Sequence, residues 1–314
     1  MTAINMPDHD QMIGAQATSS SGKRVFIGPK GLRAGWRLLI FLLMLVAMGA
    51  VARAIILRFL IPAGFAPEKF TPWSVAVQDA IFVPIVAVAA WVMSKIEGRK
   101  IGQYGLPFRR GLTKQLWLGL WIGFLASSAT VFIIYLLHGL QIATPKIHGT
   151  AILTAAAAWC GAFVLSAIAE EFLFRGYAQF TLATGIGFWP AALVLSALFG
   201  FGHLSNNGET ILGGLSVVAF GLLLCLFLRR TGALWCAVGF HIGYDWTQTF
   251  FYGVPNSGLI PSHNLFSSTL SGPRWLTGGT VGPEASVICP IVLGVVALLF
   301  SLKYREARDR PLTT

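Results

Sequence analysis

The sequence has few charged side chains, and this scarcity decides the class of protein. Only 11% of the 314 residues are charged and 55% are hydrophobic, with a mean hydropathy of +0.70. Soluble domains carry roughly 25% charged residues, so the composition excludes an ordinary soluble domain. Several apolar runs approach the roughly 20 residues that a helix needs to cross a bilayer. Alternating ten-residue strands are absent, which argues against a membrane β-barrel.

Other absences narrow the organisation of the chain. The four cysteines lie within apolar runs, without the spacing of a disulfide framework or a zinc knuckle, and are interpreted as small core residues. Residues 1–30 are polar and lack the apolar segment of a signal peptide, so we expect a disordered cytoplasmic tail there. No internal repeat and no second domain are visible, and residues 31–314 are expected to form a single transmembrane domain.

Apolar stretches separated by Pro, Gly and charged residues predict the fold class. We expect an all-α, polytopic transmembrane helical bundle with about eight spans. The predicted spans are 36–57, 75–94, 116–138, 152–180, 188–205, 210–228, 233–251 and 285–302.

The basic residues indicate orientation. The net charge is +11, but Lys and Arg fall between the apolar spans, as orientation signals do, so no nucleic-acid partner is expected. With the N-terminus inside, 17 basic residues face the cytoplasm and four face the other side, namely Arg58, Lys69, Lys146 and Arg274. This asymmetry predicts that both termini are cytoplasmic.

Ionisable residues inside the predicted spans are the candidates for function. A charge at the centre of a bilayer costs about 2.5–3.5 kcal/mol on insertion scales, so such residues face a protein or aqueous interior and usually have a role. The candidates are Glu170, Glu171, Arg175, His203, His241 and Asp245.

Helical spacing separates the two glutamates. Glu171 and Arg175 are four residues apart and can form an ion pair. Glu170 points about 100° away from Glu171 and is left to face a different space. The alternative is that the whole cluster is an ion pair for helix packing, although such a pair needs only one glutamate.

The same four-residue spacing recurs in two later spans. Phe199 precedes His203 by four residues, and His241 precedes Asp245 by four. The carboxylate of Asp245 could orient the imidazole of His241. The glycines on either side of His241 would let another helix approach closely. A buried His is often only a packed core residue, but two of them beside an unpaired glutamate favour a chemical role.

The depth of Glu170 depends on where its helix ends. If the helix ended at Glu171, His203 would lie roughly 22 Å deeper and the two could not meet. The apolar pattern continues through FLFRGYAQFTLA, so we predict a span of about 158–180 with Glu170 near mid-membrane.

The segment 252–284 is rich in Gly, Pro and Ser and is long enough to cap a site. Two acidic residues near span ends, Asp79 and Glu284, are interpreted as interfacial.

The three spaced motifs, EExxxR, FxxxH and HxxxD, resemble those of the CPBP family of intramembrane proteases (CAAX protease and bacteriocin-processing, or Abi). The match covers roughly residues 150–250, which we expect to be the catalytic core. The resemblance implies an α-helical membrane fold with a buried hydrophilic chamber. It also implies that Glu170 is the general base for water, assisted by His203, and that His241 and Asp245 bind the oxyanion or orient the carbonyl. Glu171, Arg175 and Phe199 would support them.

Two points stay open within this resemblance. The family often has Asn where this chain has Asp245, and an ionised Asp cannot donate to an oxyanion. Asp245 would rather orient a protonated His241. A divalent metal such as zinc is conceivable on Glu170, His203 and His241, but no HExxH helix is present.

The sequence therefore predicts an intramembrane endopeptidase that uses glutamate-activated water, with metal dependence open. The alternative is a proton- or ion-coupled transporter with the same residues as a relay. The absence of an internal repeat disfavours the transporter. Expected partners are the lipid bilayer and a membrane-associated or lipidated peptide or protein substrate. The expected location is a cell membrane, as a multi-pass protein of the bacterial inner or plasma membrane.

Overall fold

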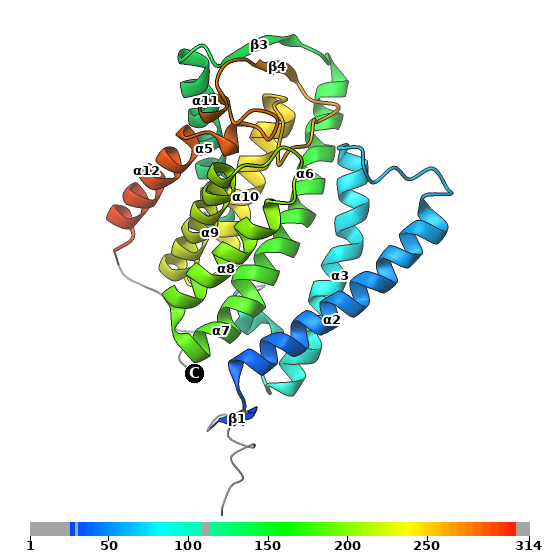
Figure 1. Cartoon of the computed structure of the whole chain (residues 1–314), viewed down its shortest axis with the longest axis vertical. Coiled ribbons are helices and arrows are strands. Elements are labelled where there is room, and N and C mark those ends of the chain that lie inside the picture. Colours follow the sequence, from blue (N-terminus) through cyan, green and yellow to red (C-terminus); the bar gives the residue numbers. More distant parts are fainter. Residues whose placement is uncertain (1–25, 29–30, 108–113, 306–314) are drawn as a thin grey trace, which may run out of the picture.

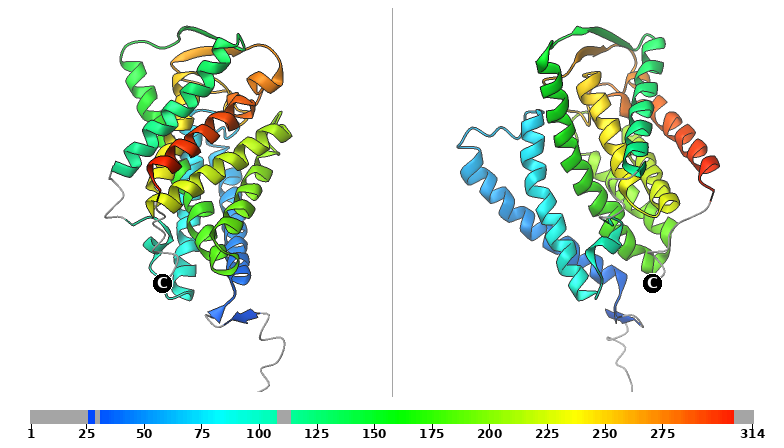
Figure 2. Two further views of the ribbon diagram at one scale, coloured as in Figure 1. Left: turned by 90° about the vertical axis from the view of Figure 1, so that its left-hand side faces the viewer. Right: turned by 180° about the vertical axis from the view of Figure 1, so that it is seen from behind.

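The computed structural model describes residues 26–28, 31–107 and 114–305, and it is a bundle of helices (Figure 1). Most of the expected tail, residues 1–30, lies outside the described residues. The long helices run along the length of the bundle, and a two-stranded sheet lies across the end remote from the N-terminal strand β1 (Figures 1 and 2). The helices that coincide with predicted spans are α2 (Ala34–Ile55), α3 (Pro72–Ile96), α5 (Lys114–Leu136), α6 (Thr150–Glu171), α8 (Phe188–His203), α9 (Ile211–Thr231), α10 (Trp235–Trp246) and α12 (Ile288–Lys303).

Within the described residues, five helical segments are long and apolar enough to cross a membrane: Ala34–Leu60, Pro72–Ile96, Lys114–Leu136, Thr150–Ile186 and Ile211–Thr231. Helices α8 and α12 are apolar but shorter. Large apolar side chains are exposed on the outer faces of the bundle, such as Val46 on α2 and Leu125 on α5, as expected of a surface that contacts lipid. The prediction of an all-α membrane bundle is confirmed. The number of eight spans and the cytoplasmic position of both termini stay predictions.

Glycines bring α5 and α10 together at the centre of the bundle. A Cβ added at Gly239 would lie 2.1 Å from the carbonyl oxygen of Leu116, and one at Gly243 equally close to that of Leu120. Helix α5 also approaches through a glycine, because a Cβ at Gly123 would lie 2.1 Å from the carbonyl oxygen of Phe240 on α10. No side chain fits at these distances, so the backbones pack directly against each other. The predicted close approach at the glycines beside His241 is confirmed, and it fixes α10 firmly.

The helix that carries Glu170 does continue beyond it. Helix α6 passes into the π-helical segment η4 (Phe172–Ala178) and then into α7 (Gln179–Ile186), which gives one helical run from Thr150 to Ile186. The backbone departs from helical geometry at Gly176, where φ is −83° and ψ is −110°. A π-turn of this kind is found mostly at functional sites. Glu170 therefore lies inside the run and just before its irregular turn.

A buried carboxylate holds this irregular turn against three other segments. Glu97, which follows α3, accepts hydrogen bonds from Tyr177 of η4 at 2.7 Å and from Tyr104 of the 3-10 turn η3 (Ile101–Tyr104) at 3.1 Å. Arg37 of α2 pairs with the same carboxylate at 3.0 Å. We call Arg37, Glu97, Tyr104 and Tyr177 the Glu97 cluster. Both oxygens of Glu97 are occupied by donors, one of them a cation.

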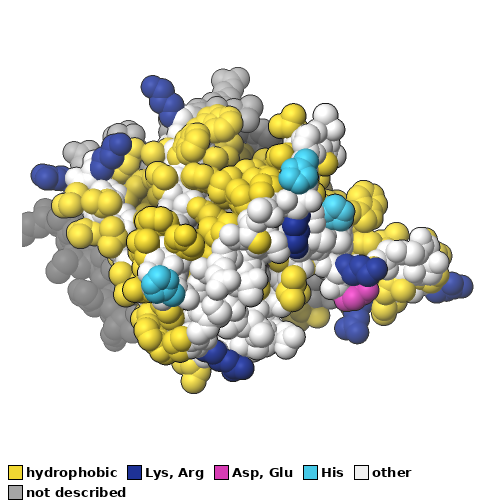
Figure 3. All heavy atoms as spheres, turned by 90° about the horizontal axis from the view of Figure 1, so that it is seen from above, with side chains coloured by type: hydrophobic (Ala, Val, Ile, Leu, Met, Phe, Trp, Pro, Cys, Tyr) yellow, Lys and Arg dark blue, Asp and Glu magenta, His cyan; other side chains and the backbone are white. Residues whose placement is uncertain are grey.

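The end of the bundle remote from β1 is covered by loops and a small sheet. Strand β3 (Leu140–Pro145) pairs antiparallel with β4 (Phe266–Leu270), with Leu140 opposite Leu270. Residues 252–287, which we call the covering segment, contain β4, the short helix α11 (Arg274–Thr277) and the 3-10 turn η6 (Pro283–Ala285). Seen from above, this end shows scattered Lys, Arg and His side chains and little acidic surface (Figure 3). The remaining described elements are β1 (Ile27–Gly28), β2 (Gly31–Leu32), and the π-helical segments η2 (Ile56–Leu60) and η5 (Thr247–Phe251).

Candidate active site

A polar cavity lies between the helices α6, α8, α9, α10 and α12 and the covering segment. Its water-accessible volume is about 80 Å³, and a water molecule needs about 10–15 Å³ by this measure, so several waters fit. All four predicted catalytic residues line it, and so does one predicted supporting residue, Phe199. The cavity is lined by Glu170, Phe199, His203, Ser216, Val217, Phe220, His241, Tyr244, Asp245, Asn256, Ser257, Glu284 and Cys289.

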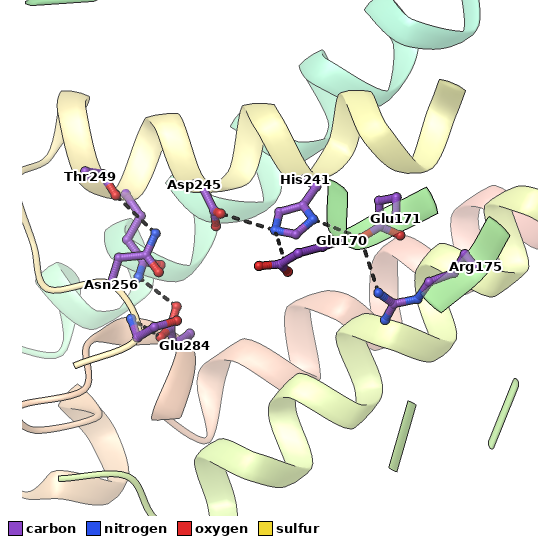
Figure 4. Close-up of polar contacts among 10 residues, drawn as sticks. Glu170, Glu171, Arg175, His241, Asp245, Thr249, Asn256 and Glu284 are labelled. Carbon is purple, nitrogen blue, oxygen red and sulfur yellow. Dashed lines mark hydrogen bonds and ion pairs between the residues drawn. The ribbon is translucent and has the colours of Figure 1, made fainter. Parts of the chain in front are cut away.

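The predicted ion pair between Glu171 and Arg175 closes the inner end of the site. The two side chains are 3.2 Å apart and are only 0% and 1% exposed. The same oxygen of Glu171 also contacts Nδ1 of His241 at 2.9 Å, a contact that the spacing did not predict (Figure 4). Glu171 therefore links the arginine of η4 to the histidine of α10.

Glu170 lies on the cavity side of the same helix, as its spacing predicts. Its carboxylate is 3.9 Å from Nε2 of His241, and 32% of its side chain is exposed. In Figure 4 it extends toward the His241 ring and lies apart from Arg175. The structure thus separates the two adjacent glutamates into one that is bound to a cation and one that faces the cavity.

His241 lies among three carboxylates. Its Nδ1 faces Glu171, while its Nε2 is 3.3 Å from Asp245, one turn further along α10. A carboxylate accepts hydrogen bonds only, so carboxylates at both ring nitrogens favour a ring that carries a proton on each. Asp245 is therefore in a position to orient a protonated His241. The ring edge of His241 also packs against Phe220.

His203 reaches the cavity from the end of α8. Its Nδ1 is 2.8 Å from the carbonyl oxygen of Phe199. A carbonyl can only accept, so Nδ1 carries the proton and Nε2 is the acceptor when the ring is neutral. The rings of Phe199 and His203 pack edge to face, with their centroids 4.5 Å apart. The central carbon of the Arg175 guanidinium lies 4.6 Å from the centroid of the Phe199 ring. Phe199 therefore separates His203 from the buried ion pair.

Several residues of the cavity were not found from the sequence. Asn256, Ser257 and Glu284 come from the covering segment, whose role the sequence leaves open. Glu284, interpreted from the sequence as interfacial, has its carboxyl on the cavity wall, where it accepts a hydrogen bond from Gln248 of η5 at 3.0 Å. The sequence contains a partial signal for the partner of Glu284, because positions 241, 245 and 248 share one face of a helix, which places Gln248 on the same side as His241 and Asp245.

The donor set does not fit a resident metal ion. Among the described residues, no three His, Cys, Asp or Glu side chains are grouped so that they could hold one. Both nitrogens of His241 already face carboxylates, and Nδ1 of His203 faces a carbonyl. The candidate ligands Glu170, His203 and His241 share a cavity but do not converge on one point.

A helical membrane bundle with carboxylates and histidines around a buried, water-sized cavity has the components of a hydrolytic membrane enzyme. Residues 152–247, about a third of the chain, match the family described as type II CAAX prenyl endopeptidase Rce1-like. This match confirms the resemblance to the CAAX proteases (CPBP family) over residues 152–247. No curated protein and no solved structure matches the chain.

The matched segment contains α6, η4, α7, α8, α9 and α10, which carry all seven residues predicted from the motifs. The match indicates a peptidase of the intramembrane type, and the apolar helices of the described residues are in keeping with a multi-pass membrane protein. The predicted transporter lacks comparable support. Glu284 and Asn256 lie outside the matched segment.

Proposed function

We propose that the protein is an intramembrane endopeptidase in which Glu170 activates a water molecule for attack on a peptide bond. The observation that carries the proposal is the difference between the adjacent glutamates. Glu171 is 3.2 Å from Arg175 and fully buried, whereas Glu170 lines a cavity with room for water. A general base needs a free acceptor that reaches the water it deprotonates.

The reaction then divides among residues of this chain. Glu170 accepts a proton as the water oxygen bonds to the carbonyl carbon of the substrate. His241 donates from Nε2 to the oxygen that becomes negative, because that nitrogen has the longer contacts, 3.3 Å to Asp245 and 3.9 Å to Glu170. The C–N bond then breaks and the proton held by Glu170 passes to the departing amine.

The other residues prepare these groups. Asp245 and Glu171 hold the His241 ring from both sides, which fixes its orientation and favours its protonated form. Nε2 of His203 is an acceptor on the cavity wall and assists in placing the water. Arg175 neutralises Glu171, so that Glu171 does not compete with Glu170 as a base. No step is assigned to a metal ion.

The substrate class we propose is a membrane-associated or lipidated peptide or protein, and the location a plasma membrane, such as the bacterial inner membrane, with both termini cytoplasmic. The family match supports the substrate class, and the excess of basic residues on one side supports the topology.

The test is cleavage of prenylated and plain membrane peptides by the full chain in detergent, with products mapped by mass spectrometry. We expect Glu170→Gln and His203→Ala to lose cleavage, and Glu68→Gln, which changes an exposed loop carboxylate, to keep it. Unchanged cleavage in Glu170→Gln would overturn the proposal.

A metal chelator added to the same assay tests the metal question separately. We expect cleavage to persist after complete metal removal, as measured by elemental analysis of the same sample. Loss of cleavage that returns with added zinc would contradict a metal-free mechanism.

A further inference from the structure

Glu284 is a carboxyl group on the cavity wall that neither the three motifs nor the family match includes. It comes from η6, at the opposite end of the cavity from Arg175 (Figure 4). Its side chain faces the same space as Glu170 and Asp245.

The local backbone is built to deliver this side chain. One oxygen of Glu284 accepts from Nε2 of Gln248 at 3.0 Å, and the other accepts from the backbone N–H of Ser257. Gly282, two residues earlier, has φ of +119°, and a Cβ there would lie 2.1 Å from the carbonyl oxygen of Pro255. Only glycine permits this conformation at this distance. The chain therefore fixes the carboxyl of Glu284 against two other segments.

This carboxyl lacks a cationic partner. Within the described parts of the chain, no Lys or Arg forms an ion pair with Glu284, and none lines the cavity. Burial, and next the nearby carboxylate of Asp245, raise the pKa of Glu284 to about 8. A buried carboxyl in this state gains from any cation that reaches it. An arginine already satisfies Glu171 in the same way at the other end of the site.

A second acceptor stands beside it. The amide nitrogen of Asn256 donates to Oγ1 of Thr249 at 3.1 Å, so the amide oxygen is the atom of that side chain suited to accept a hydrogen bond. Asn256 is 5% exposed and lines the cavity with Glu284. An ammonium or guanidinium group carries several donors and no acceptor, which matches a pair of acceptors.

The distance from His241 to Glu284 can be expressed in residues of a bound peptide. Gln248, which holds Glu284, follows His241 by seven residues, or roughly 10 Å at 1.5 Å per residue. An extended peptide advances about 3.3–3.6 Å per residue. A substrate strand lying along α10 from His241 would therefore reach Glu284 about three residues from the bond that is cleaved.

We propose that Glu284 and Asn256 form a specificity subsite that binds a basic side chain of the substrate about three residues from the cleaved bond. The inference rests on the proposed endopeptidase function and deepens it. Acidic side chains at that position are repelled by Asp245, and by Glu284 once it is ionised, and neutral ones are tolerated without gain. Glu284 thus sets which peptides are cleaved well and takes no part in activating the water.

The test is a series of membrane peptides with one mapped cleavage site, in which Lys, Gln or Glu replaces each residue up to five positions on either side. We expect Lys to raise kcat/KM about tenfold over Gln at a single position about three residues away, and Glu to lower it. In Glu284→Gln the preference for the Lys peptide over the Gln peptide disappears. In Glu284→Lys the preference reverses toward the Glu peptide.

Glu209→Gln is the matched control, because Glu209 is a nearby loop carboxylate that does not line the cavity. It should keep the preference for Lys. If the wild type cleaves peptides with no preference for Lys at any position, the subsite is disproved and the endopeptidase stands. If the wild type cleaves no peptide, the proposed function itself fails. Should both Glu284 variants unfold, the wild-type series alone decides.

Discussion

Two buried groups of carboxylates in this protein are built in opposite ways. In the Glu97 cluster, one carboxylate receives two tyrosine hydroxyls and an arginine, and its side chain is 4% exposed. In the cavity, Glu170 has its nearest ion-pair partner at 3.9 Å and Glu284 has no cationic partner among the described residues. A carboxylate whose lone pairs are all in use can hold helices together, whereas one with an acceptor to spare can act on water or substrate.

Glu171 stands between these two extremes. It is as buried as Glu97 and has a cation, Arg175, but it also contacts His241 in the site. Its second oxygen has no hydrogen-bond partner within the described structure. We therefore expect substitution of Glu170 to affect activity, substitution of Glu97 to affect stability, and substitution of Glu171 to affect both.

The largest effect is expected from Glu170→Gln. The amide keeps the size of the side chain but cannot accept a proton from water, and a general base contributes about 10²–10⁴-fold. We expect kcat to fall by about 10³-fold while the thermal unfolding midpoint stays within about 2 °C of wild type. A midpoint that falls along with activity would mean that Glu170 belongs with Glu97 as a structural group.

Next comes Glu171→Gln, which leaves Arg175 buried with a weaker partner. Breaking a buried ion pair by removal of one charge costs about 3–5 kcal/mol. We expect the free energy of unfolding in detergent and denaturant to fall by about that amount, and kcat to fall as His241 loses the carboxylate at Nδ1. A variant as stable as wild type would show that Glu171 does not neutralise Arg175.

A smaller loss is expected from Glu97→Gln. Hydrogen bonds to a charged group contribute about 1.5–3 kcal/mol, and the cluster joins α2, η3 and η4. We expect stability to fall within that range and kcat per folded molecule to stay within about twofold. Arg99→Gln is the control, because Arg99 is 4.0 Å from Glu97 and more exposed. A large loss of kcat in folded Glu97→Gln would contradict the assignment of a purely structural role to Glu97.

The sequence predicts the helices and the inner half of the site well, for a physical reason. Apolar runs mark each helix, and the pairs Glu171–Arg175, Phe199–His203 and His241–Asp245 are local, so the helical period alone brings them together. The turn at η4 could not be predicted, because it depends on Gly176 packing beneath Phe172 and Tyr104.

The outer half of the site, and one contact of its inner half, depend on contacts between distant segments. Glu284 meets Gln248 across 36 residues, and Glu171 meets His241 across 70. No periodicity relates such positions, and a Glu that follows Pro in a glycine-rich loop is most often exposed to solvent. The Glu97 cluster is equally distant in sequence, since Arg37 and Tyr177 lie on opposite sides of Glu97. Tertiary packing decides which of these carboxylates is saturated.

Glu284, which lies outside the five candidate membrane spans of the described residues, is expected to make stability depend on pH. Burial and then Asp245 raise its pKa from 4.5 to about 8, so between these values the folded protein binds more protons than the unfolded chain. Stability contributed by this group is therefore complete below about pH 4.5 and is lost as the pH rises to about 8, with a slope of at most about 1.4 kcal/mol per pH unit. Unfolding measured from pH 5 to 8 should show this slope in wild type and lose it in Glu284→Gln.

Glu97, bound by Arg37, offers the contrast: a Glu97→Gln background should leave the slope between pH 5 and 8 in place, because that slope belongs to the carboxyl without a cation. An unchanged slope in Glu284→Gln would mean that Glu284 is ionised in the folded protein and already has the partner that the substrate is proposed to supply.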